Sequence, residues 1–565
     1  MHNLQQSFAP LYGEEKGNTL TDAIQNHFTN LPKPIAFKKE PDWYKNMNFY
    51  IVYPDGIEGS NDVPLRNLKD QLDWVRDLGC NAIHILPFLD SPMIDKGFDI
   101  SNFYDVRQDL GTLEDLMDIK KRADELDIHV FMDIVFNHVS DEHEWFQKAE
   151  SGDEYYRNFF FWSKDKPEYH GNVTNEYGVF AKYVIDGKEK EVYIVFPETV
   201  GEIPHWRQGK DGYWYYHTFY PQQLDVNWFN PDLFLEFAKI VMYWASLGFH
   251  FRLDAIPFVG KGIYKDALYD DKKTHMIVHA MYEVAKMVNP NCAYLVETYE
   301  SLDSVIKYFG TANDPETTLA YNFHLCAHTW ISLVKRDCTS MRKIVEETRN
   351  VPVHAEWINF LRNHDELSIS FVDGETRMST VTELAKGGAL FRGGHGLGGR
   401  TFSLLGKDME RLAMAYALVA SVPGAQGIVY GDDVAMENVD IHTLPEADQK
   451  DTRNINRGIL KQAWKTDPAR QTLIKALQEI FNKRRFLAYY MNAFPEIIFA
   501  EIPEVFICRY HHGTSTLVTF ANLSEKEMTI DYVFKNGEVV LTVNNACLDS
   551  DKVILGKYGC LWVQE

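Results

Sequence analysis

The decapeptide FHFRLDAIPF, residues 249–258, combines a buried-strand pattern with ionisable side chains. Its apolar run carries Arg252 and ends in Asp254, and an acidic side chain at the tip of an apolar strand is costly to bury without a partner or a task. Arg252 and Asp254 are two residues apart, so in a strand both side chains lie on the same face. Taken alone, the pair also fits a structural salt bridge.

Seven further β-rich runs flank this one along the chain. Most follow amphipathic stretches such as residues 65–78 and 113–126, whose apolar side chains recur at three- and four-residue steps. Strands alternating with helices predict parallel pairing through right-handed crossovers, and eight such units predict a (β/α)8 TIM barrel. Periodicity alone also allows a doubly wound sheet. The predicted strands are residues 48–53, 82–86, 130–135, 249–254, 293–297, 321–324, 357–361 and 426–430.

Two regions depart from this alternation and predict additional domains. Residues 140–230 follow the third strand, are crowded with aromatic residues and Gly, and are too long for a structureless loop, which predicts an inserted small domain B. Residues 488–565 show short alternating strands separated by turns, which predicts a C-terminal antiparallel β domain, a β-sandwich. The barrel would comprise residues 46–139 and 231–487, and an N-terminal arm would occupy residues 1–45.

The composition excludes several classes of partner. The chain has 57 basic and 81 acidic side chains, a formal charge of -24, which argues against binding nucleic acid or anionic membranes and fits a neutral substrate. The seven cysteines are far apart and form no CxxC pair, so neither a disulfide framework nor a zinc ribbon is indicated. We see no signal peptide and no window with the roughly 20 apolar residues that span a bilayer, and we therefore expect a cytoplasmic location. The oligomeric state is left open.

Polar side chains gather at the carboxyl ends of the predicted strands, which in a parallel barrel form one rim. Singly, each has a structural interpretation: Asp133 would bond neighbouring backbone, and His138 and His364 would be satisfied core histidines, because two histidines so far apart make no metal motif. Together they predict an active site. The set comprises Asp99, Asp133, Asn137, His138, Arg252, Asp254, Glu297, Asn363, His364 and Asp365.

Several of these residues lie in strings that resemble a known family. Four strings resemble, in order and on the matching strands, the four sequence regions of the α-amylase family of retaining glycoside hydrolases, glycoside hydrolase family 13. Residues 137–149, 214–233 and 355–367 are similar to trehalose synthases and oligo-1,6-glucosidase-like members. The resemblance covers about residues 45–490 and the β domain. The four strings are DIVFNHVS (133–140), FRLDAIPF (251–258), LVETYE (295–300) and FLRNHDE (360–366).

The resemblance implies a catalytic role for three carboxyl groups. Asp254 would be the nucleophile that forms a covalent β-glucosyl ester, and Arg252 would keep it ionised, since a nearby cation lowers the pKa of an acid. Glu297 would protonate the departing glycosidic oxygen and then deprotonate the incoming water or sugar hydroxyl. Asp365 would accept hydrogen bonds from the 2- and 3-hydroxyls of the sugar.

Four further residues are implied to bind substrate. His138 and His364 would bind hydroxyls in the same subsite. Asp99 matches the position that caps the non-reducing end of the glucose in exo-acting relatives, and Arg457 matches an arginine that pairs with it. A surface or interdomain salt bridge is an equal alternative for Arg457.

The chain departs from the family pattern at two places. RGILKQAW (457–464) stands where relatives carry an RTPMQW-like string, and DTRNINR (451–457) is closer to amylosucrase-like sequences. Asn137 and Asp225 match two usual calcium ligands, but Lys261 stands where trehalose synthases place a glutamate ligand, and an ammonium group repels a cation. We therefore expect no required cofactor and a salt bridge from Lys261 to Asp225.

Three functions follow from this resemblance. The first is an exo-acting α-glucosidase or α-glucan hydrolase, and the second is a glucosyl transferase or isomerase of the trehalose synthase or amylosucrase type. They differ in whether water or a sugar intercepts the covalent ester, and we expect the aromatic insert and the loop 385–407 to form the wall that decides this. The glycines of that loop lack a GK[ST] ending and indicate a mobile loop, not a phosphate cradle. The third, a non-catalytic amylase-like scaffold, would need a membrane anchor, and none is visible.

Overall fold

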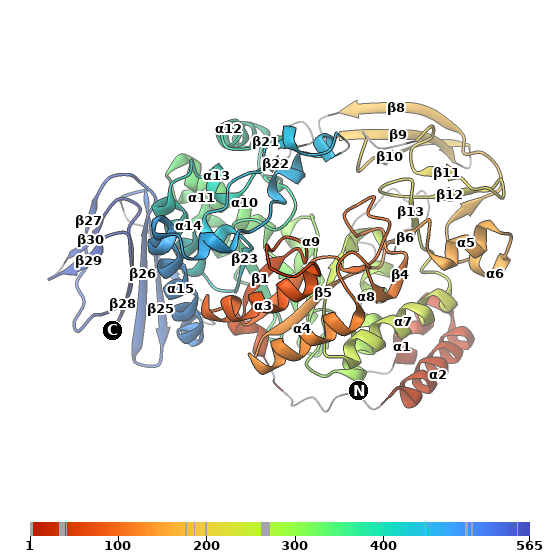
Figure 1. Cartoon of the computed structure of the whole chain (residues 1–565), viewed down its shortest axis with the longest axis horizontal. Coiled ribbons are helices and arrows are strands. Elements are labelled where there is room, and N and C mark those ends of the chain that lie inside the picture. The colour runs from red at the N-terminus through yellow and green to blue at the C-terminus, as the bar shows by residue number, and fades with distance from the viewer. Residues whose placement is uncertain are drawn as a thin grey trace.

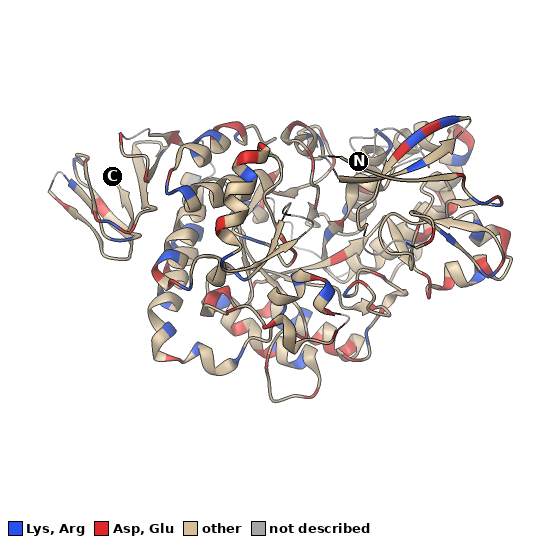
Figure 2. Cartoon of the chain, turned by 90° about the horizontal axis from the view of Figure 1, so that it is seen from above, with Lys and Arg blue, Asp and Glu red and all other residues tan. Residues whose placement is uncertain are grey.

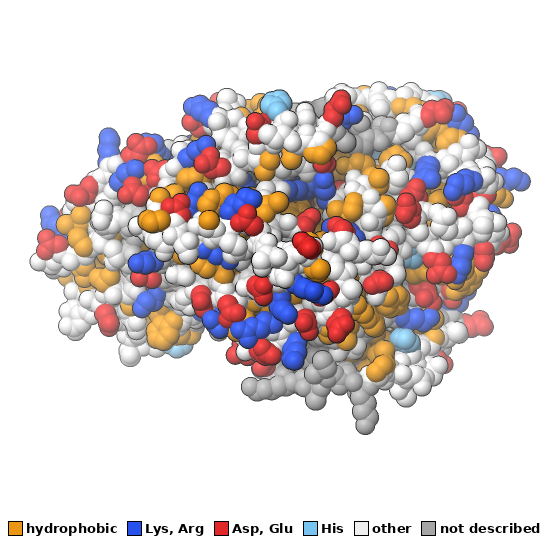
Figure 3. Space-filling model, viewed as in Figure 1, with side chains coloured by type: hydrophobic (Ala, Val, Ile, Leu, Met, Phe, Trp, Pro, Cys, Tyr) orange, Lys and Arg blue, Asp and Glu red, His pale blue; other side chains and the backbone are white. Residues whose placement is uncertain are grey.

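The structure, a computed structural model, describes residues 4–32, 40, 42–175, 178–185, 187–197, 201–260, 272–391, 394, 396–446, 448–491, 495–498, 501–550 and 552–565. The barrel occupies the centre of the elongated molecule, with the C-terminal sheets at one end and strands β8 (Tyr169–Asn175), β9 (Gly178–Ile185) and β10 (Lys188–Tyr193) near the other (Figure 1). Acidic and basic residues are interspersed along the ribbon in Figure 2, and their side chains are interspersed over the face seen in Figure 3. Among the described residues, no helix is long and apolar enough to cross a membrane.

Eight parallel strands close into a barrel, which confirms the predicted fold class and excludes a doubly wound sheet. The strands are nearly continuous apolar runs because both of their faces are buried. Seven of the eight predicted strands coincide with a barrel strand to within one residue at each end. In spatial order the strands are β1 (Asn48–Val52), β2 (Ala82–Ile85), β5 (His129–Val135), β14 (His250–Asp254), β15 (Tyr294–Val296), β18 (Leu319–Tyr321), β19 (Glu356–Phe360) and β23 (Ala425–Val429).

The sixth predicted strand was wrong in its position. Residues 321–324 were expected to form it, whereas β18 ends at Tyr321 and helix α10 (Phe323–Lys335) follows almost at once. The side chain of Asn322 accepts a hydrogen bond from the backbone N–H of Leu325 and so caps the helix. The aromatic residues after this cap therefore belong to the helix.

Helices surround the barrel and bury one face each. α3 (Pro64–Asp77) and α4 (Leu113–Glu125) match the predicted amphipathic stretches, and Leu65, Leu68 and Leu72 of α3 are fully buried. The other long helices around the barrel are α7 (Pro231–Ser246), α8 (Lys272–Val288), α10, α11 (Thr339–Glu347), α12 (Gly374–Leu384), α14 (Met409–Ala420) and α15 (Gln471–Phe486).

The segment between β6 (His138–Ser140) and α7 forms small antiparallel sheets with a core of their own. That core includes Phe161, Tyr183 and Trp206. The last strand pairs back to β6, which sets Asp225 opposite His138. The elements are α5 (Glu144–Glu150), α6 (Glu154–Arg157), β7 (Trp162–Ser163), β8 (Tyr169–Asn175), β9 (Gly178–Ile185), β10 (Lys188–Tyr193), β11 (Trp206–Gln208), β12 (Trp214–Tyr216) and β13 (Gln223–Asp225).

The C-terminal strands form two antiparallel sheets around a second core. A five-stranded sheet has the order β24-β25-β26-β31-β28 and a three-stranded sheet has the order β27-β30-β29. Val505, Phe520 and Val553 belong to the cluster between them. The strands are β24 (Glu496–Ile497), β25 (Val505–His512), β26 (Ser515–Asn522), β27 (Met528–Asp531), β28 (Glu538–Val543), β29 (Ala546–Asp549), β30 (Lys552–Leu555) and β31 (Cys560–Gln564).

The N-terminal segment lies against the outside of the barrel. α1 (Leu4–Tyr12) and α2 (Glu14–Asn30) pack on α7, where the rings of Phe8 and Phe234 are 4.8 Å apart. Farther along, Trp43 stacks on His129 at 3.6 Å and closes the amino end of the barrel. This contact fixes the chain just before it enters β1.

Candidate active site

Three acidic side chains reach the carboxyl end of the barrel from three different strands. Asp254 is the last residue of β14, Glu297 directly follows β15, and Asp365 lies in the loop after β19. Because the strands run parallel, their ends meet at one rim. The structure therefore brings together three residues spread from position 254 to position 365 of the sequence.

Arg252 is fully buried beneath this rim and holds three carboxylates at once. Its Nη1 donates to Asp133 Oδ1 at 2.8 Å and to Asp254 Oδ1 at 2.6 Å, while its Nη2 forms an ion pair with Glu297. The predicted placement of Arg252 and Asp254 on one face is thus confirmed. Arg252 and Asp254 form a salt bridge. Arg252 also links Asp254 to Glu297, the two carboxyl groups to which the family resemblance assigns catalytic roles.

The two carboxyl groups on Arg252 are perturbed to different extents. Burial raises the pKa of Asp254 to about 6, against the lowering effect of Arg252. Burial also raises the pKa of Glu297 to about 8. Arg252 lowers this pKa, and the nearby carboxylates of Asp254 and Asp365 raise it further. Near pH 7 the pair therefore holds an ionised Asp254 beside a protonated Glu297, as a nucleophile and a general acid require.

The pKa of Asp365 is shifted in the opposite direction, below its usual value. Burial alone would raise its pKa, but His364, Arg453 and Arg457 together keep it well below its usual value. Arg453 and Arg457 reach Asp365 Oδ1 at 3.4 and 3.3 Å. The lowered pKa keeps this carboxylate ionised near pH 7. The backbone N–H of Asp365 donates to Asn363 Oδ1 at 3.1 Å, which holds the main chain at this position.

The two predicted histidines differ in their surroundings. His364 is buried with its Nε2 3.1 Å from Asp365 Oδ2, and its Nδ1 has no hydrogen-bond partner. A buried ring nitrogen without a partner is costly and suits a ligand hydroxyl. His138 Nε2 donates to the carbonyl of Phe98 at 3.2 Å and its Nδ1 accepts from the Asn137 amide at 3.1 Å, so both nitrogens of His138 have protein contacts.

The expected pair between Asp99 and Arg457 was wrong. The carboxylate of Asp99 is buried within its own loop, where it accepts hydrogen bonds from the Ser91 hydroxyl and from the backbone N–H groups of Ile94 and Asp95. Arg457 instead contacts Asp365. The loop contains Lys96 and Gly97 at positive φ, and its own Ser91, Ile94 and Asp95 supply the donors to Asp99.

Sequence reasoning missed three residues at the rim. Asp95, four positions before Asp99, accepts a hydrogen bond from Gln223 at 3.0 Å, and its pKa is raised to about 6 by burial although Arg453 lowers it. Arg453 joins Asp451 to Asp365. Tyr53 directly follows β1, and its hydroxyl is buried without a partner. Position after a barrel strand was a usable signal for Tyr53.

Aromatic residues from the insert and from two barrel loops form one cluster beside the site. Phe196 of the insert, Phe258 after β14 and Phe391 of β21 (Ala389–Phe391) belong to it. The guanidinium of Arg453 lies 5.7 Å from the ring of Phe196 and 5.3 Å from that of Phe391. The insert and the loop 385–407 therefore meet, as expected, and they do so next to an arginine that contacts Asp365.

Comparison with known proteins agrees with this geometry. Residues 51–392 match the family model for the alpha amylase catalytic domain, which is more than half of the chain. The chain belongs to the α-amylase family. This membership covers the barrel strands that carry Asp133, Arg252, Asp254 and Glu297, together with the loop that carries Asp365.

Among curated members of this family, the chain is 30% identical over 421 residues to the trehalose synthase/amylase of Mycobacterium tuberculosis, covering 72% of this chain and 65% of that protein. The chain thus spans less than two thirds of that relative. It is 26% identical over 377 residues to a salivary alpha-glucosidase of Anopheles gambiae, covering 60% of each. A trehalulose synthase structure shares the fold, with a TM-score of 0.71 and 17% identity over 93% of this chain and all of that one.

The two side chains that match calcium ligands of the family make hydrogen bonds within the chain. The Asn137 amide donates to Asp225 Oδ1 at 3.0 Å, and the same carboxylate accepts from the backbone N–H and the hydroxyl of Thr218. Both oxygens of the Asp225 carboxylate therefore have neighbouring donors. Among the described residues, no three His, Cys, Asp or Glu side chains form a metal-binding group. Lys261, and hence its expected salt bridge to Asp225, lies outside the described residues.

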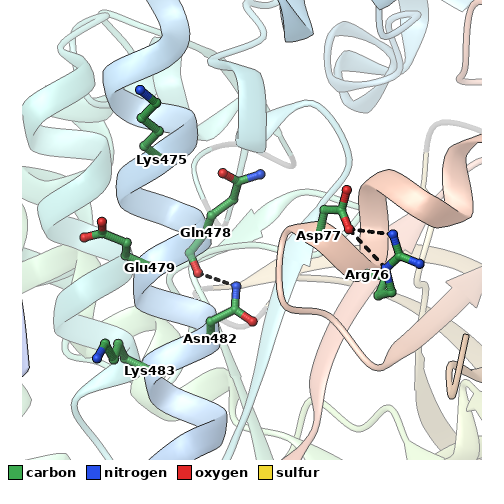
Figure 4. A pocket seen from close by; sticks show the side chains of 7 residues that line it. All are labelled: Arg76, Asp77, Lys475, Gln478, Glu479, Asn482 and Lys483. Carbon is green, nitrogen blue, oxygen red and sulfur yellow. Dashed lines mark hydrogen bonds and ion pairs between the residues drawn. The ribbon is translucent and has the colours of Figure 1, made fainter.

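A surface hollow of about 520 Å³ lies far from this rim, between α3 and α15 (Figure 4). Arg76 and Asp77 at the end of α3 pair with each other at 2.8 Å on one side of it. α3 leads into the amino end of β2, so the hollow faces the opposite end of the barrel from Asp254. It is not part of the candidate active site.

Proposed function

We propose that the chain cleaves terminal α-linked glucose with net retention of configuration, through a covalent β-glucosyl ester on Asp254. The observation that carries this proposal is the Arg252 guanidinium shared by Asp254 and Glu297, whose pKa values are raised to about 6 and about 8. One shared cation keeps a nucleophile ionised beside an acid that is still protonated. This is the pairing that a double displacement needs.

In the first step, an Asp254 oxygen attacks the anomeric carbon while Glu297 transfers its proton to the glycosidic oxygen. The C1–O bond breaks and the rest of the substrate leaves as an alcohol. In the second step, Glu297 takes a proton from water or from a sugar hydroxyl, and that oxygen attacks C1. The ester bond breaks, Asp254 regains its carboxylate, and the two inversions give retention.

The fixed anion at Asp365 supports exo-action. As a low-pKa carboxylate it would accept hydrogen bonds from sugar hydroxyls and stabilise positive charge at the ring in the transition state. Arg453 and Arg457 contact the same oxygen of Asp365, and Asp95 lies near Arg453. We infer that this group of charged side chains closes the subsite behind one glucose unit, so that only a chain end fits.

A second candidate, transfer of the glucosyl group to a sugar, is favoured by the aromatic cluster. Phe196, Phe258 and Phe391 place apolar rings beside Arg453. Such rings stack on the apolar faces of a sugar acceptor and exclude water, which would slow hydrolysis of the ester. The relative from Mycobacterium tuberculosis is named a trehalose synthase/amylase, which is consistent with such a transfer.

The experiment that tests the proposal is incubation with maltose, sucrose, trehalose, isomaltose and maltooligosaccharides, with products followed by NMR. We expect the α-anomer of glucose, or a new α-linked disaccharide, as the first product. The matched control is Asp254→Asn, which should lower kcat by roughly 10³-fold or more while leaving the unfolding temperature unchanged. First release of the β-anomer, or absence of turnover with every substrate, would contradict the proposal; the latter would favour the scaffold alternative.

We also propose a cytoplasmic location. All seven cysteines are free, and six of them are buried. Unpaired thiols throughout a chain of this size suit a reducing compartment. Detection of the native protein only in a secreted fraction would contradict this.

A further inference from the structure

A second groove lies outside the barrel, between α10, α11 and α12, which are neighbours in Figure 1. It encloses about 680 Å³, within the range of about 300–1,000 Å³ of small-molecule sites. Leu302, Ile331, Ile344 and Val372 supply apolar surface to its lining. The groove contains none of the carboxyl groups assigned to the barrel rim.

Phe371 presents an aromatic ring at this groove. The side chain is 38% exposed, and its ring lies 4.5 Å from the ring of His324 with an interplanar angle of 32°. Its φ of 65° lies in the left-handed region, which a bulky residue rarely adopts because it costs roughly 1–2 kcal/mol. The fold thus holds a large apolar ring at the surface in a conformation that is unfavourable by itself.

The two histidines that line the groove are uncharged near pH 7. Burial lowers the pKa of His324, whose Nε2 donates to the carbonyl of Glu300 at 3.0 Å. Burial also lowers the pKa of His328 to about 4, and its Nδ1 lies 2.6 Å from the Ser340 hydroxyl. These rings therefore offer neutral hydrogen-bonding groups.

The remaining charges of the lining nearly balance. Lys335 and Lys343 stand against three carboxylates, which leaves a formal charge of −1 (two minus three). Lys343 is already 3.7 Å from Glu347. A phosphate or other anion would gain little here, because its binding requires unopposed cations. The carboxylates are Asp337, Glu347 and Asp373.

We propose that this groove is a second carbohydrate-binding site, in which a neutral oligosaccharide stacks on Phe371 and hydrogen-bonds to the surrounding histidine, hydroxyl and carboxylate groups. A pyranose has apolar C–H faces and a rim of hydroxyls, which match an exposed ring bordered by short-range donors and acceptors. The inference goes beyond the proposed function, because it does not depend on whether the barrel hydrolyses or transfers glucose.

The groove is joined to the barrel rim through two loops. Glu300, whose carbonyl fixes His324, lies three residues after Glu297, and Phe371 lies six residues after Asp365, just beyond the short strand β20 (Leu367–Ser368). A sugar chain held on Phe371 is therefore anchored beside the loops that carry two of the rim carboxylates. The site would hold a long substrate near the barrel and would matter little for a short one.

The test is calorimetric titration of maltoheptaose into the full chain carrying Asp254→Asn, with the barrel subsite blocked by 1-deoxynojirimycin. We expect one remaining binding event. Adding Phe371→Ala should weaken its Kd roughly tenfold, since an aromatic contact is worth about one factor of ten in affinity. Phe371→Tyr, which keeps the aromatic ring, should bind maltoheptaose with an unchanged Kd.

The matched control is Phe486→Ala, which removes a 71% exposed phenylalanine from α15 and should leave binding unchanged. Unfolding temperatures of all variants establish that each is folded. Loss of all maltoheptaose binding in the presence of the inhibitor would overturn the proposal, as would unchanged Kd in the Phe371→Ala variant. Saturable binding of inorganic phosphate without maltoheptaose binding would assign the groove to anions and would also overturn it.

Discussion

Arg252 Nη1 lies 2.6 Å from Asp254 Oδ1 at the carboxyl end of β14. The same nitrogen also donates to Asp133 at 2.8 Å, so the position of the Asp254 carboxylate depends on a buried residue of the neighbouring strand. A carboxylate held in this way cannot rotate freely. The pH dependence of activity and the effects of substitutions near Asp254 should therefore reflect the contacts of Arg252.

The pH dependence of kcat/KM should be bell-shaped. Burial raises the pKa of Asp254 to about 6, so protonation below that pH removes the nucleophile. Burial raises the pKa of Glu297 to about 8, so ionisation above that pH removes the general acid. Because the groups interact, the two limbs belong to the pair. A profile measured from pH 4 to 10 checks this, and Glu297→Gln should abolish the alkaline limb; an unchanged alkaline limb would contradict the assignment.

Replacing Arg457 should impair substrate binding. Arg457→Gln removes one cation from Asp365 and should lower kcat/KM roughly 10–100-fold, since hydrogen bonds to charged groups contribute about 1.5–3 kcal/mol. Arg457→Lys should recover part of this loss. Arg122→Gln, at an exposed ion pair with Asp73, serves as the control. Equal kinetics for the Gln variant and this control would contradict a role for Arg457.

His84 should act as a positioning residue. Its Nε2 lies 2.9 Å from Asp133 Oδ2, and Asp133 in turn holds Arg252. His84→Leu leaves a buried carboxylate oxygen without this donor and should lower kcat about tenfold with little change in KM, whereas His84→Gln can donate again and should restore kcat. Steady-state kinetics checks both. A change in KM without a change in kcat would contradict a positioning role through Asp133. A kcat of His84→Gln as low as that of His84→Leu would also contradict it.

The sequence predicted the barrel well because each strand is a buried and largely apolar run, and the family strings located Asp254 at the end of β14, Glu297 just after β15 and Asp365 in the loop after β19. The sequence did not predict which way a side chain points when it lies in a turn. Asp95 and Asp99 are four residues apart in one loop that turns through positive φ values at Lys96 and Gly97, and Asp99 accepts hydrogen bonds from the backbone N–H groups of Ile94 and Asp95 in that loop. Such a turn has no periodic pattern in the sequence.

The sequence did not indicate which carboxylate each arginine contacts. Arg453 and Arg457 lie in or next to the short 3-10 helix Thr452–Asn456, and both reach Asp365. A helix of five residues is too short for sequence periodicity to predict the direction of its side chains. The position of β18 was missed because the capping role of Asn322 depends on the helix that follows.

Removing divalent ions should change nothing. The side chains that match calcium ligands, Asn137 and Asp225, are hydrogen-bonded to each other, and Thr218 satisfies the remaining acceptor atoms. We expect equal activity and equal unfolding temperature before and after chelation with EDTA. A fall of more than a few degrees, reversed by added calcium, would show that a cation binds there.

Acidification should destabilise the amino end of the barrel. Burial lowers the pKa of His129 to about 4, with Lys120 and Arg485 contributing, and burial lowers that of His250 well below its usual value. Both groups are neutral when folded and bind protons more readily when unfolded, near pH 6.5. The free energy of unfolding should therefore fall as the pH drops from about 6.5 towards 4. His129→Gln should lessen this fall in unfolding temperature, whereas His170→Gln, at a half-exposed position, should not. If the unfolding temperatures of His129→Gln and of the unaltered chain depended on pH in the same way, the role of His129 would be contradicted. Proton uptake by His129 on unfolding would then make no measurable contribution to the loss of stability in acid.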